Sequence, residues 1–322
     1  LWYELIVNFF RCYHYTESVL HPVYQYCSLF GSRHLRTLTG KFETCARSGA
    51  YPFYDGKHFT IQITHSSLSS AANAITMVTV IIKEWGNCTQ QKVYEVSSDD
   101  RDLMTAFVDG STFNGNPKRK AVEIIARNDT HVEININHIA TNITVMKRGP
   151  FLGVSLLIPE DNVQEFATDV ETLCRSGCSG GKLMQVKEAL VKPLEFTQCH
   201  GTRLKTSIKT AANRCAEVGV RDEFFDACVF DLMTSGNDLV TSVELDAQND
   251  IVKRYLPYNT KVNSTSTGRA NLSIYHSLSY DHKFSDCIAF VPRPPSSPSS
   301  AKRLAKFWSF TTLLTRLDST FN

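Results

Sequence analysis

The sequence predicts a mainly β protein: an antiparallel sandwich followed by a helical portion that disulfides hold in place. Three observations carry this prediction: short segments rich in Ile, Val, Phe and Thr, turn signals between them, and a change of period after Pro159. Short strands in this number and spacing favour a sandwich. We expect strands at residues 58–64, 75–83, 92–96, 121–127, 131–137, 142–147 and 152–158. Turn signals separate them at Asp55-Gly56, Asp109-Gly110, Asn114-Gly115, Asn128-Asp129 and Gly149-Pro150.

The segment at residues 131–137 shows the strand pattern most clearly. Its apolar residues fall at every second position. Because successive side chains of a strand point to opposite faces, we expect Ile134 and Ile136 to be buried. Asn135 and Asn137 should then face away from the core.

The period becomes helical after the last expected strand. We expect helices at residues 160–173, 206–218, 222–234 and 242–256. In the third of these, Phe225, Cys228 and Leu232 lie on one face, and Gly236 stands where a residue that ends a helix belongs.

The chain is predicted to divide into three parts. Residues 1–26 are interpreted as a linker that continues from a longer protein, since the apolar run at residues 5–10 has no basic flank before it and no cleavage site after it. Residues 27–256 form the main domain. Residues 257–322 form a flexible tail, in which the Ser/Pro-rich run at 292–300 cannot pack a core.

Composition excludes several classes of protein. Ten cysteines, an even number, indicate disulfides in an oxidising compartment. Cys174-x3-Cys178 is the only close pair, and no second Cys or His pair has the spacing of a zinc finger. A net charge of +2 favours neither nucleic acid nor an acidic membrane surface as a partner. We expect no metal and no cofactor. Five Asn-x-Ser/Thr sequons, which agree with a secreted origin, are predicted N-glycosylation sites: Asn87, Asn128, Asn142, Asn263 and Asn271.

Motifs of several common enzyme classes are missing from the chain. It contains no HExxH, Walker or GxGxxG sequence, and its ten histidines are scattered. We therefore predict that the protein is not an enzyme and has no catalytic residue.

Several motifs resemble one known family. The opening motif, Cys27-Ser-Leu-Phe-Gly-Ser-Arg-His-Leu-Arg-Thr-Leu38, is followed by Gly49-Ala50-Tyr51-Pro52. Together they resemble the start of the von Willebrand type D-like domain of the repulsive guidance molecule family, which includes hemojuvelin. Further matches come in the family's order, from Cys12 to about Ala247: Gln91-Lys-Val-Tyr-Glu95, Ala106-Phe-Val-Asp-Gly-Ser111, Leu173-Cys-Arg-Ser-Gly-Cys178 and Ala227-Cys-Val-Phe-Asp-Leu-Met-Thr-Ser-Gly236. The resemblance implies a von Willebrand type D-like sandwich.

The resemblance also implies an extracellular ligand or co-receptor. Such a protein would bind the fibronectin type III repeats of a neogenin/DCC-class receptor and modulate bone morphogenetic protein signalling or axon guidance. The growth factor would bind an N-terminal module that precedes Cys12. Gly49, Ala50, Tyr51 and Pro52 are expected to form a loop that contacts the receptor; alternatively, they only shape a turn between strands.

Two further interpretations concern the setting of the protein. The second candidate function is an adhesive or matrix glycoprotein with a D-type domain, although the Cys-Gly-Leu-Cys-Gly motifs of such chains are missing. A weak lipid-anchor signal is present, with Ser299-Ser300-Ala301 as the attachment site and a short apolar run at residues 307–314. The expected location is the cell surface or the extracellular space.

The resemblance makes two statements about covalent chemistry. It implies disulfides between Cys27 and Cys228 and between Cys12 and Cys88. In the family, the carboxyl group of an Asp-Pro dipeptide attacks its own peptide carbonyl and cleaves the chain. Here Ser32-Arg33 replaces that dipeptide, so we expect this self-cleavage site to be lost. An N-to-O shift at Ser32 with His34 as base is the alternative chemistry, and an ordinary buried segment that enters a strand is the structural one.

Overall fold

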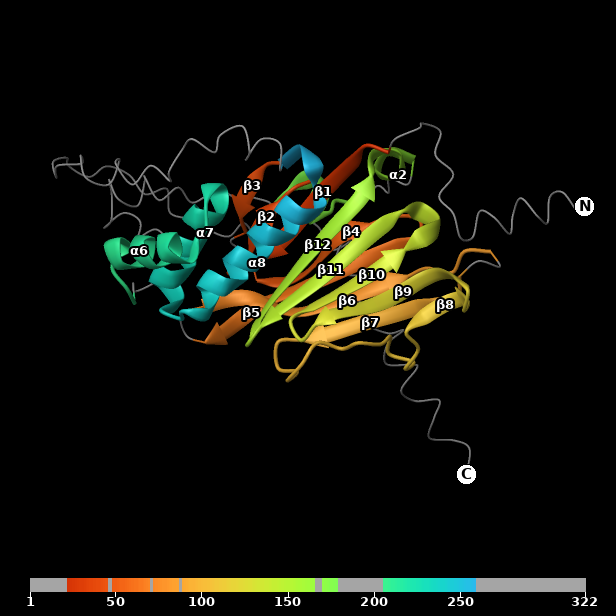
Figure 1. Ribbon diagram of the computed structural model, residues 1–322, viewed down its shortest axis with the longest axis horizontal. Helices are drawn as coiled ribbons and strands as arrows, with labels where there is room; N and C mark the ends of the chain where they lie inside the picture. The colour runs from red at the N-terminus through yellow and green to blue at the C-terminus, as the bar shows by residue number, and fades with distance from the viewer. Residues whose placement is uncertain are drawn as a thin grey trace, which may run out of the picture. The chain divides into compact units, whose positions relative to one another are not determined.

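The computed structural model describes residues 22–45, 48–69, 72–86, 89–165, 170–178 and 205–258, which form two antiparallel sheets and a group of helices (Figure 1). The first sheet has eight strands, in the order β3 (Phe42–Thr44), β2 (His34–Arg36), β1 (Tyr24–Phe30), β12 (Phe151–Pro159), β11 (Thr141–Arg148), β10 (His131–Ile136), β9 (Arg119–Asn128) and β8 (Phe113–Asn116). The second sheet has four, in the order β4 (Gly49–Asp55), β5 (Phe59–Ser69), β6 (Ala72–Ile82) and β7 (Lys92–Ser97). The predicted mainly β architecture is confirmed.

The seven strands expected from the sequence are all present as β5, β6, β7, β9, β10, β11 and β12, with ends that shift by a few residues. Sequence reasoning missed β1 to β4 and β8. β2 and β3 have three residues each, too few to show a period. β4 contains Pro52, and β8 contains the Asn114-Gly115 pair that reads as a turn. The expected loop at Gly49–Pro52 is therefore a strand.

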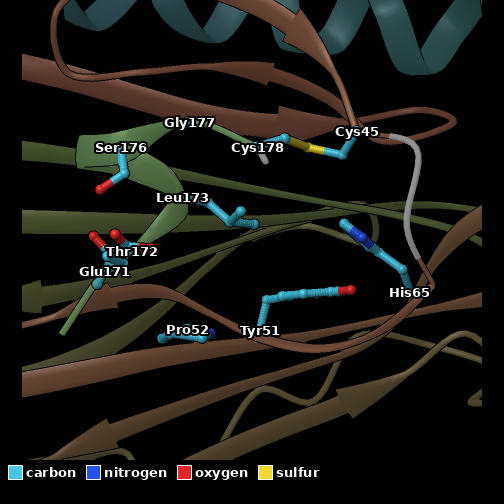
Figure 2. Close-up of a pocket in the computed structure, with 10 residues that line it drawn as sticks. All are labelled: Cys45, Tyr51, Pro52, His65, Glu171, Thr172, Leu173, Ser176, Gly177 and Cys178. Atoms are coloured by element: carbon cyan, nitrogen blue, oxygen red, sulfur yellow. A yellow bond between two sulfur atoms is a disulfide. The ribbon is translucent and has the colours of Figure 1, made fainter. Parts of the chain in front are cut away.

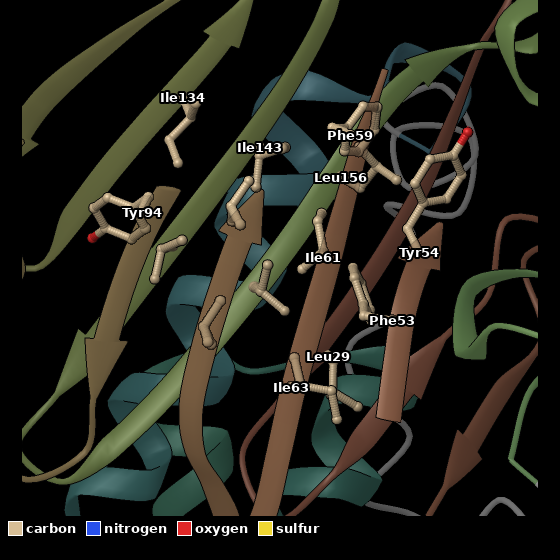
Figure 3. Packing of buried hydrophobic residues seen from close by; sticks show 14 of the residues in the cluster. Leu29, Phe53, Tyr54, Phe59, Ile61, Ile63, Tyr94, Ile134, Ile143 and Leu156 are labelled. Atoms are coloured by element: carbon tan, nitrogen blue, oxygen red, sulfur yellow. The ribbon is translucent and has the colours of Figure 1, made fainter. Parts of the chain in front are cut away.

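A single apolar core fills the space between the two sheets (Figure 3). Phe53, Ile61 and Tyr94 reach it from the four-stranded sheet, and Leu29 and Leu156 reach it from the eight-stranded sheet. None of the five is more than 1% exposed, which is the degree of burial that a sandwich interior requires.

The alternation predicted for residues 131–137 is confirmed. Ile134 and Ile136 are fully buried, whereas Asn135 is half-buried on the opposite side of the strand. Asn137 is also half-buried, but it lies in the 3-10 helix η1 (Asn137–Ile139) that follows β10. The register of β10 is therefore the expected one.

Helices follow the last strand. They are α2 (Glu160–Glu165), α3 (Leu173–Ser176), α6 (Ile208–Val218), α7 (Asp222–Ser235) and α8 (Leu239–Arg254). The helix expected at 160–173 is wrong as a single element: α2 and α3 are separate, and residues 166–169 lie outside the described part.

Ser207 caps the start of α6, where its side chain accepts a hydrogen bond from the Thr210 backbone N–H. α7 ends as predicted at Gly236, which has a φ of +66°. None of the described helices has the length and apolar character needed to cross a bilayer.

The helices pack on the outer face of the eight-stranded sheet, where α8 crosses β1, β11 and β12 (Figure 1). Successive side chains of β1 pack on opposite faces of this sheet. Cys27 and Leu29 point into the sandwich core, while Tyr26 and Phe30 belong to a second apolar cluster with α6, α7 and α8. The ring of Phe30 stacks on Phe224 of α7 with 5.1 Å between ring centroids. β1 thus joins the sandwich to the helical group.

The alternation in β1 explains why one implied disulfide is wrong. Cys27 bonds Cys174, and Cys228 bonds Cys215 in the neighbouring helix. Because Cys27 faces the sandwich core and Cys228 faces the helical cluster, the two lie on opposite sides of the sheet. The implied pairing of Cys12 with Cys88 lies outside the described residues.

Candidate functional site

The turn that joins β1 to β2 has an unusual backbone. Gly31 has a φ of +54° and Arg33 a φ of +76°. A side chain other than glycine is strained in this region, and proline, whose ring fixes φ near −65°, cannot adopt it. At the position where the family motif has Asp-Pro, this chain therefore holds a turn that a proline could not form.

Asp231 of α7 holds this turn from the helical side. The Ser32 backbone N–H donates to Asp231 Oδ2 at 2.7 Å, and His34 Nε2 lies 2.8 Å from Asp231 Oδ1. The other ring nitrogen of His34 lies 2.9 Å from Thr44 Oγ1. Both nitrogens of His34 are thus engaged by groups other than the Ser32 hydroxyl, which has no hydrogen-bond partner among the described residues. This geometry gives His34 no contact through which to act as a base on Ser32, and it favours the structural interpretation of the segment.

We predict that the secreted chain stays a single polypeptide across Gly31–His34. The attacking carboxyl group and the proline leaving group of the family chemistry are both replaced, by Ser32 and Arg33. A reducing gel followed by N-terminal sequencing checks this: we expect one full-length band. A fragment that begins at Ser32 or Arg33 would show that the bond still breaks.

A second buried carboxyl group faces the same turn. Glu244 of α8 is fully buried, and a Cβ atom built on Gly31 would lie only 2.2 Å from Glu244 Oε1 and 2.4 Å from Asp231 Oδ2. Burial raises the pKa of Glu244 well above its usual range, and the negative charge of Asp231 raises it further. Sequence reasoning missed both carboxylates. A signal existed for Asp231, since it stands three residues after Cys228 on the apolar face of α7.

The residues predicted to contact a receptor lie on β4, the edge strand of the four-stranded sheet. β4 pairs with β5, Gly49 opposite His65 and Ala50 opposite Thr64, and no strand lies on its other side among the described residues. Ala50 is exposed, whereas Tyr51 and Pro52 are half-buried. An edge strand presents unpaired backbone groups, which is a common way for one protein to dock on another.

A hollow of about 230 Å³ adjoins this edge (Figure 2). Tyr51 and Pro52 line one side of it, and Leu173 of α3 faces Tyr51 from the other. The hydroxyl group of Tyr51 donates to the Ser48 carbonyl oxygen at 3.0 Å, which fixes the ring along the rim. The hollow is thus large enough for one side chain of a partner and has an aromatic wall.

Disulfides make the far wall of this hollow rigid. Cys178 bonds Cys45, and Cys174 in α3 bonds Cys27 of β1. The Cys178 backbone N–H also donates to the Glu43 carboxylate at 2.7 Å. Sequence reasoning did not connect this segment with Gly49–Pro52, because the two are more than 120 residues apart and neither motif carries a sign of the other.

The structure places only some of the predicted glycosylation sites. Asn128 is exposed at the end of β9. Asn142 is half-buried in β11, where its amide nitrogen donates to Asn135 and its oxygen accepts from Arg254, so its side chain is already engaged. Asn87, Asn263 and Asn271 lie outside the described residues, as do the tail beyond residue 258 and the lipid-anchor signal.

Comparisons with known proteins agree on one family. Residues 23–256 match the family described as the repulsive guidance molecule (RGM) C-terminal domain. Among curated proteins, the chain is 35% identical over 237 residues to the repulsive guidance molecule B homolog drag-1 of Caenorhabditis elegans, covering 73% of this chain and 57% of that protein. It is 32% identical over 269 residues to human repulsive guidance molecule B, with coverage of 79% and 61%. It is also 32% identical over 235 residues to mouse hemojuvelin, with coverage of 71% and 53%. The chain spans little more than half the length of these relatives, and over that span it belongs to the repulsive guidance molecule family.

Proposed function

We propose that this chain is the receptor-binding part of an extracellular ligand or co-receptor, and that it docks on the fibronectin type III repeats of a neogenin/DCC-class receptor. Membership of the repulsive guidance molecule family supports this proposal. The three disulfides among the described residues agree with an extracellular setting, at the cell surface or after secretion. No catalytic role is proposed. Growth-factor binding would belong to a module N-terminal to the matched region, and through it the whole protein would modulate bone morphogenetic protein signalling or axon guidance.

The observation that carries the proposed contact is the exposed Ala50 on the edge strand. A methyl group covers little of the backbone, so a partner surface can approach β4 closely. The hollow beside it, with Tyr51 and Pro52 on its rim, can then take one apolar or aromatic side chain of the receptor. Buried anchor side chains of this kind supply most of the free energy of a typical interface.

Replacing Ala50 with Arg tests the proposed contact. A long charged side chain at the centre of the contact is expected to weaken receptor binding by at least ~2 kcal/mol, or about 30-fold in Kd. Folding should change by about 0.5 kcal/mol or less, because Ala50 is exposed. Surface plasmon resonance of the secreted variant on immobilised receptor repeats measures the change in Kd.

Ala126→Arg is the matched control. Ala126 is also an exposed alanine in a strand, but it lies on β9 of the other sheet. This variant should bind as tightly as the unmodified chain. If Ala50→Arg is secreted normally and binds with an unchanged Kd, the contact lies elsewhere. If Ala50→Arg is secreted poorly while Ala126→Arg is not, Ala50 has a packing role instead.

A further inference from the structure

Three buried side chains from separate parts of the fold meet beneath the β1–β2 turn. His34 comes from β2, Asp231 from α7 and Glu244 from α8. One ligand atom from each lies within 4.8 Å of the other two. His34 is 3% exposed, and neither carboxylate is exposed at all. The sequence could not show this group, since His34 and Asp231 are 197 residues apart.

With both carboxyl groups ionised, the negative charge of this cluster exceeds any positive charge that His34 can supply. Two carboxyl groups face each other, and Asp231 already accepts a hydrogen bond from the Ser32 backbone and lies 2.8 Å from His34 Nε2. Among the described residues, no N–H or O–H donor is placed on either oxygen of Glu244. Burying a carboxylate without a donor or a cation is costly, so Glu244 must either keep a proton or face a positive charge.

His34 is oriented as metal-binding histidines are. Its Nδ1 is held by Thr44 Oγ1 at 2.9 Å, and this leaves Nε2 directed at the two carboxylates. In metal sites the second ring nitrogen is usually fixed in this way by a neighbouring polar group, which sets both the ring orientation and the tautomer. Here Thr44 of β3 supplies that group.

The turn lets the two carboxylates come close to its backbone and to each other. A Cβ atom at position 31 would collide with Glu244 Oε1 and Asp231 Oδ2, so only glycine lets these two oxygens converge there. The Ser32 hydroxyl of the same turn is also buried and has no hydrogen-bond partner among the described residues. A set of one imidazole and two carboxylates suits Zn²⁺, whereas Ca²⁺ prefers oxygen ligands alone.

We propose that His34, Asp231 and Glu244 bind one Zn²⁺ ion, which ties the β1–β2 turn to α7 and α8. The ion would neutralise both carboxylates and would be closed off from solvent. It is therefore a structural ion, acquired while the chain folds, and is independent of the proposed receptor contact at Ala50. The competing arrangement is a proton shared by Glu244 and Asp231, with no metal.

Metal content and thermal unfolding of the whole secreted chain test this proposal. The chain is expressed in medium that contains zinc chloride and in medium depleted of zinc, and both products are purified by gel filtration. We expect one zinc ion per chain by plasma mass spectrometry in the first product. When zinc is about 100-fold above its Kd, Tm should be roughly 5–10 °C higher than in the depleted product. Calcium chloride in place of zinc should leave Tm unchanged.

Glu244→Gln separates the two arrangements. Glutamine has the same shape and can donate a hydrogen bond to Asp231, so a site that only shares a proton keeps its Tm. A zinc site instead loses an anionic ligand, and the zinc content after gel filtration should fall at least tenfold. His34→Gln should cause the same loss. His131→Gln, at a half-exposed histidine far from the cluster, and Asp102→Asn, at an exposed carboxylate, should not.

Three results would overturn the proposal. One is an unmodified chain that carries no zinc from either medium and unfolds at one Tm; the cluster then shares a proton. Another is equal zinc content in the Glu244→Gln, His34→Gln and unmodified chains, which would place the ion elsewhere. The third is a calcium-induced rise in Tm as large as that with zinc, which would reject zinc as the preferred ion. If a variant is not secreted, the metal content and the two Tm values of the unmodified chain still decide.

Discussion

Replacing Cys27 and Cys174 together with alanine is expected to lower the free energy of unfolding by roughly 2–5 kcal/mol. The two cysteines are 147 residues apart, but the Cys45–Cys178 bond shortens the path between them to about 22 residues. The chain-entropy estimate for closing a loop of that length is about 3.4 kcal/mol. Both side chains are fully buried in the sandwich core, so alanine adds a small packing loss without exposing a polar group. The bond also fixes α3 against β1, and with it one wall of the hollow beside β4.

The Cys215–Cys228 bond provides the matched control. It joins residues only 13 positions apart, for which the same estimate gives about 3 kcal/mol. Urea unfolding of the two double variants should therefore give losses of similar size, with the Cys27/Cys174 change slightly the larger. Non-reducing peptide mapping should also find Cys27 linked to Cys174. Equal midpoints for the Cys27/Cys174 variant and the unmodified chain, or a Cys27–Cys228 peptide, would contradict the arrangement of the core.

The sequence was sufficient for elements whose period is long enough to see. β10 shows it best, because Ile134 and Ile136 are buried as expected and Asn135 between them faces away from the core. α7 could be predicted equally well, since its apolar face and its terminal glycine are both visible in the local sequence. The strands that were missed are short or contain turn residues, so their own sequences show no strand period. They are extended because they pair with neighbouring strands.

Long-range pairings could not be predicted because the sequence does not say which face of β1 meets which layer. β1 pairs with β12, with Cys27 opposite Leu156. This pairing places Cys27 beside Leu156 on the face that points into the sandwich, away from Cys228. The candidate sites also depend on residues that are far apart in the sequence. The Gly49–Pro52 edge was recognisable as a motif, but its hollow needs Leu173, and the His34 cluster needs α7 and α8, which begin 188 and 205 residues later.

A buried ion pair anchors the last helix to the sheet. Arg254 of α8 is 10% exposed and Asp250 is 7% exposed, with Arg254 Nη1 2.9 Å from Asp250 Oδ1. The guanidinium group also donates to Ser155 Oγ at 2.9 Å. It donates as well to Asn142 and Thr144 of β11. Asp250 in turn accepts from the hydroxyl of Tyr26 at 2.7 Å. One arginine thus connects α8 with β11 and β12.

We predict that Arg254→Leu lowers the free energy of unfolding by about 3–5 kcal/mol. Removing the guanidinium leaves Asp250 with a buried negative charge, and it leaves the oxygens of Ser155 and Asn142 without their donor. Much of the cost therefore comes from the group left behind. Adding Asp250→Asn should recover part of the loss, because the uncompensated charge is then removed. Urea unfolding of the single and double variants measures both steps.

Arg148→Leu is the control for charge alone. Arg148 of β11 also pairs with a carboxylate of α8, Asp246, at 2.6 Å, but its side chain is 37% exposed. Water reaches this pair from the Arg148 side and can replace the lost partner, so the expected cost is only about 1 kcal/mol. Equal losses from Arg148→Leu and Arg254→Leu would mean that burial does not set the strength of the Arg254 contacts. If adding Asp250→Asn recovers no stability, the negative charge left on Asp250 is not the source of the loss. The loss would then come from the missing hydrogen bonds to β11 and β12.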